Sequence, residues 1–321
     1  MTYNDLAQIV RQNHSFLICA HENPDGDSIG AQLAFYKYLK KLDKNVLVYN
    51  KDQTPRKFHF LPNCESISNK MPRKKFDVLF MLDCSNAQRP GIDNLSNFAA
   101  KIVNIDHHRD NKSYGDYNFV EENSAATCIL LYEYFKQNDI EIDADMANCL
   151  LTGILMDTQG FEFNNADGSL YLTANDLVKC GADNGKLFKK LFAESSPADL
   201  KVRAKIWETL EFFADGKISV ISMNKNLPIA YGADSSATEG LSNDVMGCVG
   251  VEVGIFAKYD KREVRFSLRS AGKVDVGEIA AQYPVGGGHK FAAGCTAKKL
   301  GLREAIAAIV DKISLQLPAP C

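Results

Sequence analysis

The sequence predicts a two-domain α/β protein, in which a parallel-sheet domain precedes a smaller α/β domain. The chain has 321 residues, a length that corresponds to two domains of ~100–200 residues each. Through its first half, short apolar runs alternate with helical patterns, as in the β-α-β units of a parallel sheet. Later runs instead alternate apolar and polar residues, which is typical of half-buried strands. We therefore expect a first domain at 1–194, a linker helix at 195–216 and a second domain at 217–321.

Four strands and five helices are expected in the first domain. The first helix is predicted at 28–42, because Ile29, Leu33 and Tyr36 recur on one side at helical spacing. Helical patterns also cover 124–137 and 145–156, and two more precede residue 195. The predicted strands are the apolar runs at 15–20, 45–50, 76–82 and 101–105.

The linker helix is expected to begin at Ser196 and Pro197, residue types favoured at an N-cap and at the first helical position, and to continue to residue 213. Strands follow in the second domain, and the last two of them flank a short turn at Asp260 and Lys261. The expected elements are strands at 217–223, 251–259 and 263–270, a helix near 275–282, a glycine-rich stretch at 286–294 and a helix at 301–316.

Composition and charge narrow the classes of function. A hydrophobic fraction of 45% with 24% charged residues fits a globular protein with a sizeable core and excludes disordered and collagen-like chains. The net charge of −3 argues against a protein that coats long duplex DNA, because such proteins need a large basic excess. The charge is unevenly divided, with 24 basic and 30 acidic residues in 1–216 but 13 and 10 in 217–321. An anionic ligand must therefore be bound by local groups.

Targeting signals and cysteines indicate the compartment. The first 16 residues are polar and lack the apolar core of a signal peptide, and no apolar run approaches the ~18 residues of a membrane span. The nine cysteines contain no C-x-x-C pair and several lie in apolar runs. Reduced, mostly buried thiols are therefore expected rather than disulfides or a zinc site. We expect a cytoplasmic protein without a membrane partner.

Acidic residues and histidines follow three of the four predicted strands of the first domain. The carboxyl ends of parallel strands lie along one edge of a sheet, where open α/β folds place their ligands. Asp157, at the end of the apolar helix, is a fourth candidate for the same edge. The stretches expected to converge there are His21-Glu22-Asn23-Pro24-Asp25-Gly26-Asp27, Asp83 and Asp106-His107-His108-Arg109.

These residue types predict a metal site. A single aspartate after a strand is more often a turn residue or a helix N-cap than a ligand. The cluster of His21, Asp25 and Asp27 differs, because Pro24 and Gly26 bend the chain so that three ligand types can face one point. Carboxylates and imidazoles without thiolates favour Mg²⁺ or Mn²⁺, and mixed sets lean towards Mn²⁺. Two such ions would neutralise four aspartates and support displacement at phosphorus, as in a metal-dependent phosphoesterase.

A glycine-rich stretch in the second domain is a candidate phosphate site. Its three consecutive glycines, 286–288, allow close backbone approach to an anion, although a tight turn fits them equally well. His289 and Lys290 follow directly, and Arg265 and Arg269 on a neighbouring strand suit bidentate phosphate contacts. Three further cations, Lys258, Lys261 and Arg262, are interpreted as parts of a solvated hairpin.

Together these stretches resemble the four motifs of the DHH phosphoesterase superfamily. The resemblance covers nearly the whole chain, and the length and layout are most similar to the stand-alone oligoribonuclease and 3′-phosphoadenosine 5′-phosphate (pAp) phosphatase group, NrnA. The first-domain match is carried by His21-Glu22-Asn23-Pro24-Asp25-Gly26-Asp27-Ser28, Asp83, Asp106-His107-His108 and Asp157. Gly286-Gly287-Gly288-His289 with Ala292-Ala293-Gly294 is similar to the signature of the DHH-associated C-terminal substrate domain.

The resemblance also implies roles for individual residues. Two divalent cations are expected, with Mn²⁺ ahead of Mg²⁺. One would be held by His21, Asp25 and Asp83, and the other by Asp27, Asp83, His107 and Asp157. Asp106 would orient the histidines, and His108 would contact the scissile phosphate and protonate the leaving oxygen. Substrate phosphates would be held by Arg109, Arg269, Gly286, Gly287, Gly288 and His289.

The function implied by the resemblance is hydrolysis of very short oligoribonucleotides to nucleoside 5′-monophosphates, or of pAp to AMP. A phosphodiesterase for linear or cyclic di-AMP shares the motifs and stays open as an alternative. A RecJ-like single-strand exonuclease usually carries a further nucleic-acid-binding module, and family II pyrophosphatase has a different second domain. A non-catalytic nucleic-acid-binding descendant would have lost ligands, whereas every expected ligand is present.

The expected partners follow from these hypotheses. They are short oligonucleotides or phosphorylated nucleotides, and not long duplex DNA or membranes. The resemblance is compatible with a homodimer, although no exposed apolar stripe in the sequence supports one.

Overall fold

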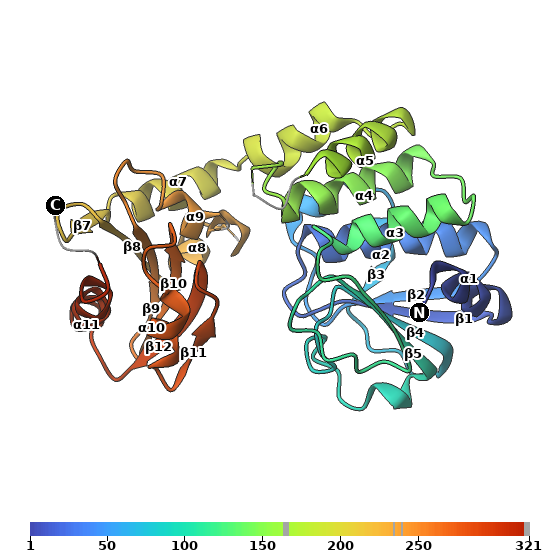
Figure 1. The fold of residues 1–321 in the computed structure, drawn as a ribbon, viewed down its shortest axis with the longest axis horizontal. Helices are drawn as coiled ribbons and strands as arrows, with labels where there is room; N and C mark the ends of the chain where they lie inside the picture. The colour runs from blue at the N-terminus through green and yellow to red at the C-terminus, as the bar shows by residue number, and fades with distance from the viewer. Residues whose placement is uncertain (163–166, 234, 239, 318–321) are drawn as a thin grey trace. The chain divides into compact units, whose positions relative to one another are not determined.

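The computed structural model describes residues 1–162, 167–233, 235–238 and 240–317. The chain forms two compact units, Met1–Glu194 and Ser195–Cys321 (Figure 1). The eight cysteines among the described residues are free, and Cys321, which the sequence predicts as a reduced thiol, lies outside them.

The first unit is built on a six-stranded parallel sheet with the order β3-β2-β1-β4-β5-β6. From β1 the chain moves outward to β2 and β3, and then returns to β4 on the other side of β1. In open α/β sheets the crevice at such a reversal, at the carboxyl ends of the strands, is where ligands bind. The strands are β1 (Ser15–Cys19), β2 (Asn45–Tyr49), β3 (Ile67–Ser68), β4 (Phe76–Leu82), β5 (Ala99–Asp106) and β6 (Tyr117–Val120).

Helices cover one face of this sheet: α2 and α3 lie against the strands, and α4 packs on α2 and α3 (Figure 1). Phe16, Phe80 and Val103 point into this helical layer, and Phe80 meets Phe35 of α2 edge to face at 4.7 Å between ring centroids. Leu17, Leu79 and Met81 face the opposite side, where loops and a short 3₁₀ helix enclose a second, smaller core. The helices are α1 (Tyr3–Gln12), α2 (Gly26–Lys41), α3 (Thr127–Gln137), α4 (Ala144–Asp157), α5 (Gly168–Lys179) and α6 (Asn184–Phe188), with short turns η1 (Arg56–Phe58), η2 (Cys64–Ser66), η3 (Leu95–Asn97) and η4 (Lys189–Ala193).

The four predicted strands of the first unit are present, with ends shifted by no more than two residues. Two strands at the sheet edges were not expected, because β3 and β6 contain only two and four residues and carry little pattern. The helix predicted from residue 124 begins at Thr127. That shift matters for the candidate site, as described below.

The second unit contains a six-stranded sheet with the order β11-β12-β10-β9-β8-β7, in which only β8 and β9 among the described strands run parallel. Its strands are β7 (Glu211–Phe213), β8 (Ile218–Asn224), β9 (Val253–Tyr259), β10 (Glu263–Ser270), β11 (Val285–Gly288) and β12 (Ala292–Lys298). Its helices are α7 (Pro197–Trp207), α8 (Leu227–Ala230), α9 (Leu241–Asp244), α10 (Val276–Ala281) and α11 (Leu302–Ser314), with the 3₁₀ turn η5 (Ser235–Thr238).

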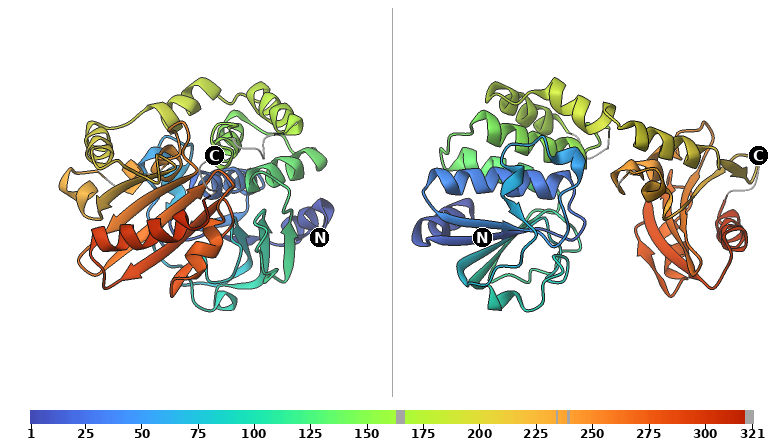
Figure 2. Two further views of the ribbon diagram at one scale, coloured as in Figure 1. Left: turned by 60° about the vertical axis from the view of Figure 1, so that its left-hand side comes forward. Right: turned by 180° about the vertical axis from the view of Figure 1, so that it is seen from behind.

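The two faces of the second sheet are covered differently. One face packs Ile255, Phe266 and Leu268 against α10 and α11, and Figure 2 shows α11 beside the strands. On the other face, Ile206 of α7 and Leu241 of α9 cover β8 and β9. The β10, β12 and β11 part of this second face carries exposed and half-buried residues.

Two expectations for the second unit need correction. The linker helix ends at Trp207, and residues 211–213 form β7 instead of continuing the helix. Ser196 does cap α7, with Pro197 as its first residue, as predicted. The three glycines 286–288 lie in the edge strand β11 and not in a tight turn, which was one of the two possibilities, and Gly288 has a φ of +142°, which disfavours other residues.

The described residues contain no helix that is both long enough and apolar enough to cross a membrane.

Candidate metal centre

The loop after β1 places the first predicted ligands. Asp25 is the N-cap of α2, and its Oδ1 accepts a hydrogen bond from the Ser28 amide at 3.0 Å. The Ser28 hydroxyl in turn accepts from the Asp25 amide at 2.9 Å, which completes a capping box. Because Oδ1 is used by the cap, Oδ2 remains to face His21, whose Nε2 lies 3.5 Å away. Local helix-start chemistry thus orients the carboxylate.

Glycines bring α2 and α4 into close contact at this point. A Cβ on Gly26 would lie 2.2 Å from Cγ of Met156, and one on Gly30 would lie 2.4 Å from the carbonyl oxygen of Cys149. A Cβ on Gly153 would lie 2.5 Å from Asp27 Oδ1. Since real Cβ contacts are not this short, only glycine lets the helices approach so closely. The contact brings Asp27, in the first turn of α2, close to the end of α4, where Asp157 lies.

Asp83 lies directly after β4, at the reversal of strand order beside β1. Its amide donates to the Ile105 carbonyl at 3.0 Å, so the backbone is held by the neighbouring strand. Its φ is +59°, which is uncommon for residues other than glycine, although aspartate adopts it more readily than most. Its side chain is almost completely buried.

Backbone carbonyls orient two of the histidines towards the aspartates. His21 Nδ1 lies 2.8 Å from the Glu22 carbonyl oxygen, and His107 Nδ1 lies 3.1 Å from the Ser124 carbonyl oxygen. A carbonyl can only accept, so each Nδ1 carries a proton and donates. Each Nε2 is therefore directed into the carboxylate cluster, as in many metal-binding histidines.

The donor atoms gather around the two carboxylate oxygens of Asp83. Oδ2 of Asp83 lies 3.4 Å from His21 Nε2. The other oxygen of Asp83, Oδ1, lies 3.6 Å from His107 Nε2. The same nitrogen lies 3.1 Å from Asp157 Oδ2 and 3.9 Å from Asp27 Oδ2. In two sets of three residues, one donor atom of each residue lies within 4.8 Å of the donor atoms of the other two. These sets are His21, Asp25 and Asp83, and Asp27, His107 and Asp157. The structure thus brings all six predicted ligands into one cluster around Asp83.

His108 is arranged differently from the other two histidines. Its Nδ1 contacts a carboxylate rather than a carbonyl, namely Asp106 Oδ1 at 2.8 Å. Asp106 is fully buried, and its second oxygen accepts from Asn111 Nδ2 at 2.5 Å. The His108 side chain is 35% exposed, so its Nε2 is available to a ligand. Arg109, next in the chain, is exposed.

The electrostatics of the cluster fit a cation site. Burial disfavours a charged His21, but Asp25 and Asp83 outweigh burial and raise its pKa to about 11. Burial also opposes a charge on His107, while the neighbouring aspartates, led by Asp157, raise its pKa to about 10. The field of the carboxylates is therefore strong enough to hold protons on both rings. Divalent cations among the same oxygen and nitrogen donors would supply this positive charge instead.

Sequence reasoning missed the role of the start of α3. The N-cap of α3 is Ala126, which has no side-chain acceptor, and Asp27 from α2 accepts the amides of Thr127 at 2.6 Å and Cys128 at 2.9 Å instead. The Thr127 hydroxyl also donates to Asp83 Oδ1 at 3.2 Å. Ser124 suggested an earlier helix start in the sequence, and no local signal shows that a distant aspartate supplies the cap.

In the second unit, Arg269 is half-buried, and its Nε donates to Asn243 Oδ1 at 2.6 Å. His289 and the glycines of β11 are exposed, and Arg265 pairs with Glu263 at 2.7 Å. Lys258 corrects the sequence interpretation, because its side chain is partly buried and is not part of a solvated hairpin. Burial lowers the pKa of both Lys258 and Arg269.

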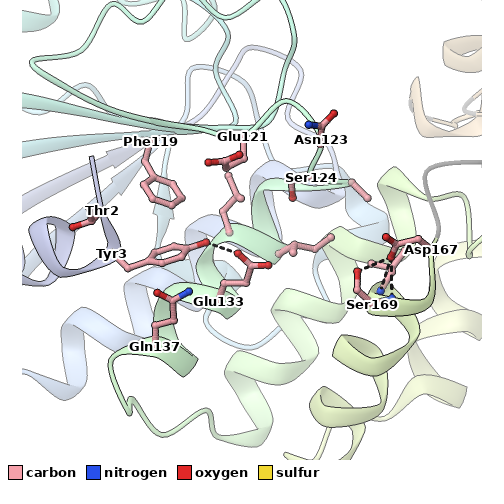
Figure 3. Close-up of a pocket in the computed structure, with 14 residues that line it drawn as sticks. Thr2, Tyr3, Phe119, Glu121, Asn123, Ser124, Glu133, Gln137, Asp167 and Ser169 are labelled. Carbon is pink, nitrogen blue, oxygen red and sulfur yellow. Dashed lines mark hydrogen bonds between the residues drawn. The ribbon is translucent and has the colours of Figure 1, made fainter.

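A pocket of about 420 Å³ lies elsewhere on the first unit, between the start of α1, β6, α3 and α5 (Figure 3). The Tyr3 hydroxyl donates to Glu133 Oε2 across it at 2.5 Å, and Asp167 caps α5 at its other end. Among the described residues that line it, none is a predicted site residue, although the Ser124 carbonyl joins it to His107. Its three carboxylates, of Glu121, Glu133 and Asp167, would repel a phosphate.

Comparison with known families matches both parts of the chain. Residues 15–154 match the model of the DHH family, N-terminal domain. Residues 218–315 match the DHHA1 domain. The first match includes every predicted first-domain site residue except Asp157, which lies three residues beyond it.

Two curated relatives are similar over almost their whole length. The chain is 31% identical over 305 residues to the bifunctional oligoribonuclease and PAP phosphatase NrnA of Thermus thermophilus, covering 94% of this chain and 89% of the relative. It is 23% identical to the protein of the same name from Bacillus subtilis, covering 91% and 92%.

Among solved structures, an exopolyphosphatase-related protein from Bacteroides fragilis has the same fold, with a TM-score of 0.86 and 23% identity. The alignment covers 98% of this chain and 95% of that one.

Proposed function

The chain belongs to the DHH family of metal-dependent phosphoesterases, and we propose that it hydrolyses very short oligoribonucleotides to nucleoside 5′-monophosphates and pAp to AMP. The observation that carries this proposal is the cluster of carboxylates and imidazoles around Asp83. The names of the two relatives, bifunctional oligoribonuclease and PAP phosphatase, support the choice of substrate.

The proposed centre holds two cations, Mn²⁺ in preference to Mg²⁺. His21, Asp25 and Asp83 hold one, and Asp27, Asp83, His107 and Asp157 hold the other. Two imidazoles in the donor set favour Mn²⁺, because Mg²⁺ prefers an all-oxygen shell. When bound, such ions supply Lewis acidity and neutralise charge on a phosphoester.

His108 is the proposed acid for the leaving oxygen. Its Nδ1 donates to Asp106, so the ring is fixed and a proton on Nε2 is directed at the substrate. Asn111 holds the other Asp106 oxygen, which prevents the carboxylate from rotating away. Asp106 thus acts as a positioning residue for His108.

Phosphates of the substrate are bound by cations and exposed backbone. We assign Arg109, Arg269 and His289 to this role, together with Gly286, Gly287 and Gly288. Support comes from the hydrogen bond between Arg269 and neutral Asn243, which leaves the guanidinium charge for a ligand. The edge position of β11 leaves backbone groups without a neighbouring strand on one side.

A cytoplasmic enzyme remains the expectation, supported by eight free cysteines in the described part of the chain. A homodimer and the absence of long duplex substrates remain predictions as well.

Product analysis with Mn²⁺ tests the proposal. The substrates are di- to tetranucleotides of RNA, 20-mers, pAp and cyclic di-AMP. We expect nucleoside 5′-monophosphates from the short RNAs and AMP from pAp, each faster than products from 20-mers. Equal or faster digestion of 20-mers would indicate a RecJ-like exonuclease, and a marked preference for cyclic di-AMP would indicate a cyclic dinucleotide phosphodiesterase.

A further inference from the structure

A fully buried asparagine, Asn104, interrupts the apolar run of β5. Its neighbours on the strand, Val103 and Ile105, point into the helical layer. Because side chains alternate along a strand, Asn104 points to the opposite face, into the smaller core that contains Cys84 and Tyr114. A buried amide is costly unless its polar atoms find partners, so the partners of Asn104 indicate what it does.

The Asn104 side chain is hydrogen-bonded through both of its polar atoms. Its Nδ2 lies 3.0 Å from the Cys84 carbonyl oxygen, 3.2 Å from the Tyr114 hydroxyl and 3.3 Å from the Met81 carbonyl oxygen. Its Oδ1 accepts a hydrogen bond from Asn111 Nδ2 at 2.8 Å. The amide thus connects the chain that follows β4 with the loop that follows β5.

The Cys84 carbonyl is the centre of this network. Besides the bond from Asn104, it accepts one from the Tyr114 hydroxyl at 3.1 Å, and it lies 3.3 Å from Asn111 Nδ2. A carbonyl oxygen has two lone pairs, so the two nearer donors, Asn104 and Tyr114, fill its capacity. The nearer acceptors of Asn111 Nδ2 are Asn104 Oδ1 at 2.8 Å and Asp106 Oδ2 at 2.5 Å.

The network holds the main chain on both sides of Asp83. The Asp83 amide donates to the Ile105 carbonyl at 3.0 Å, and the next carbonyl in the chain, that of Cys84, accepts from Asn104. With a φ of +59°, Asp83 leaves the extended path of β4, and these two bonds fix the direction of its side chain. Neither bond uses the Asp83 carboxylate, whose oxygens face the histidines of the metal centre.

The same network reaches the proposed acid. Asn111 donates to both Asn104 and Asp106, and the other oxygen of Asp106 contacts His108 Nδ1 at 2.8 Å. A chain of hydrogen bonds therefore runs from the anchored main chain through the two asparagines to His108. Such a chain keeps the metal ligands and the acid in a fixed relation to each other.

We propose that Asn104 and Tyr114 are positioning residues that fix Asp83 in the metal centre by holding the Cys84 carbonyl. The inference rests on the proposed function and deepens it, because it identifies what keeps the central metal ligand in place. Among the hydrogen bonds of the described residues, neither side chain contacts an atom proposed to bind metal, so each acts through the main chain. Partners of this kind typically contribute ~10–100-fold to metal affinity.

Sequence reasoning did not identify either residue. One asparagine in an apolar strand and one tyrosine in a loop form no pattern, and their common acceptor lies 20 and 30 residues away in the chain.

Calorimetric titration with Mn²⁺ tests the inference without relying on activity. Tyr114→Phe removes only the hydroxyl that donates to Cys84, and Asn104→Leu replaces the amide by an apolar side chain of similar size. We expect the Kd for Mn²⁺ to rise about threefold in Tyr114→Phe, within the range for one neutral hydrogen bond. In Asn104→Leu, which loses both the donor and the link to Asn111, we expect a rise of about 10-fold.

The matched control is Tyr38→Phe, which removes a hydroxyl from the helical layer on the other face of the sheet. That hydroxyl lies 3.0 Å from the Tyr134 hydroxyl, so its loss also removes one buried hydrogen bond. We expect Tyr38→Phe and Tyr114→Phe to lower Tm by similar amounts, but only Tyr114→Phe to weaken Mn²⁺ binding. A merely structural role of Tyr114 would change Tm alone.

Wild-type affinity for Mn²⁺ in Tyr114→Phe would overturn the inference, and so would equal weakening in Tyr38→Phe. Thermal unfolding checks that Asn104→Leu folds; if it does not, Tyr114→Phe decides the question.

Activity measurements separate this inference from the proposed function. If the wild type binds Mn²⁺ but cleaves no short RNA, the proposed function fails, while the titrations still decide the role of the two residues. If it cleaves short RNA, the Mn²⁺ concentration for half-maximal activity should rise by the same factors as the Kd. If the wild type binds no Mn²⁺, the proposed centre and this inference both fail.

Discussion

The metal centre of the first unit and the open sheet face of the second unit both concentrate charge of one sign, but they stabilise it differently. Among the aspartates, Asp27 accepts two backbone amides, and Asp83 accepts a hydroxyl and faces three histidine rings. Lys258 and Arg269 have only neutral acceptors among the described residues. The aspartates thus have donors within the first unit, whereas Lys258 and Arg269 have no negatively charged partner among the residues that the structure describes.

The difference shows what each region selects. A dense set of carboxylates and imidazoles with fixed orientation is suited to divalent cations. Two cations on a flat, glycine-lined face are suited to a phosphate. The overall charge of −3 conceals this division, since the negative and positive regions partly cancel in the sum.

The substitution Asp83→Asn is the most severe test of the metal centre. One neutral amide would replace the carboxylate shared by both groups of donors. We expect kcat on short RNA to fall about 1,000-fold or more, since the loss of an outer partner alone costs ~10–100-fold. Asp93→Asn, at an exposed position, is the control, and EDTA should reduce the wild type to the level of Asp83→Asn. Activity close to wild type in Asp83→Asn would refute the shared-ligand assignment.

His108→Ala separates acid catalysis from metal binding. We expect a fall in kcat of about 100-fold or more, because general acids contribute ~10²–10⁴-fold. The loss should be much smaller with a p-nitrophenyl phosphoester, whose leaving group needs little protonation. His59→Ala, which removes an exposed histidine, should behave as the wild type. An equal loss on both substrates would show that His108 does not act as the acid.

Thr127→Val tests whether the start of α3 positions the metal centre. The substitution removes the hydroxyl donated to Asp83 and keeps the amide donated to Asp27. We expect the Mn²⁺ concentration for half-maximal activity to rise about 10-fold, as for other partners of metal ligands. Thr127→Ser should restore the wild-type value. If Ser and Val variants respond alike, the hydroxyl has no positioning role.

The smallest effect is expected at Asp77. This residue contrasts with Lys258 and Arg269, because groups within the first unit already bind its charge. Its carboxylate accepts the His14 amide at 3.0 Å and the Ser15 amide at 2.8 Å, and these bonds lower its pKa. A depressed folded-state pKa adds stability above the unfolded value of about 3.9 and loses it as the pH falls below that value.

We therefore expect Asp77→Asn to lower the free energy of unfolding at pH 7 by less than ~1 kcal/mol, because Asp77 is only half-buried and solvent weakens its interactions. In urea unfolding experiments, the difference in free energy of unfolding between the variant and the wild type should become smaller below about pH 4. A difference that becomes larger in acid would contradict a stabilising role for the Asp77 carboxylate.

The sequence predicted the parts of the fold and site that depend on local patterns. Strand ends carrying His21, Asp83 and Asp106 were visible because buried strands are continuous apolar runs, and parallel strands share an edge. Contacts between distant segments had no such signal. The capping of α3 by Asp27 and the burial of Lys258 depend on which elements pack together, and neither residue's neighbours in the chain reveal it.

The glycine contacts between α2 and α4 make the metal centre sensitive to substitutions at residues that are not ligands. Gly30 lies against the main chain of α4, and Gly26 and Gly153 lie against the side chains of Met156 and Asp27, so the separation of Asp27 and Asp157 depends on the absence of a side chain at all three positions. A single added methyl group would force the helices apart, and displacements of about 1 Å can cost ~100-fold in rate. Substitutions at these three positions, none of which can bind a ligand through a side chain, should therefore act as mutations of the active site.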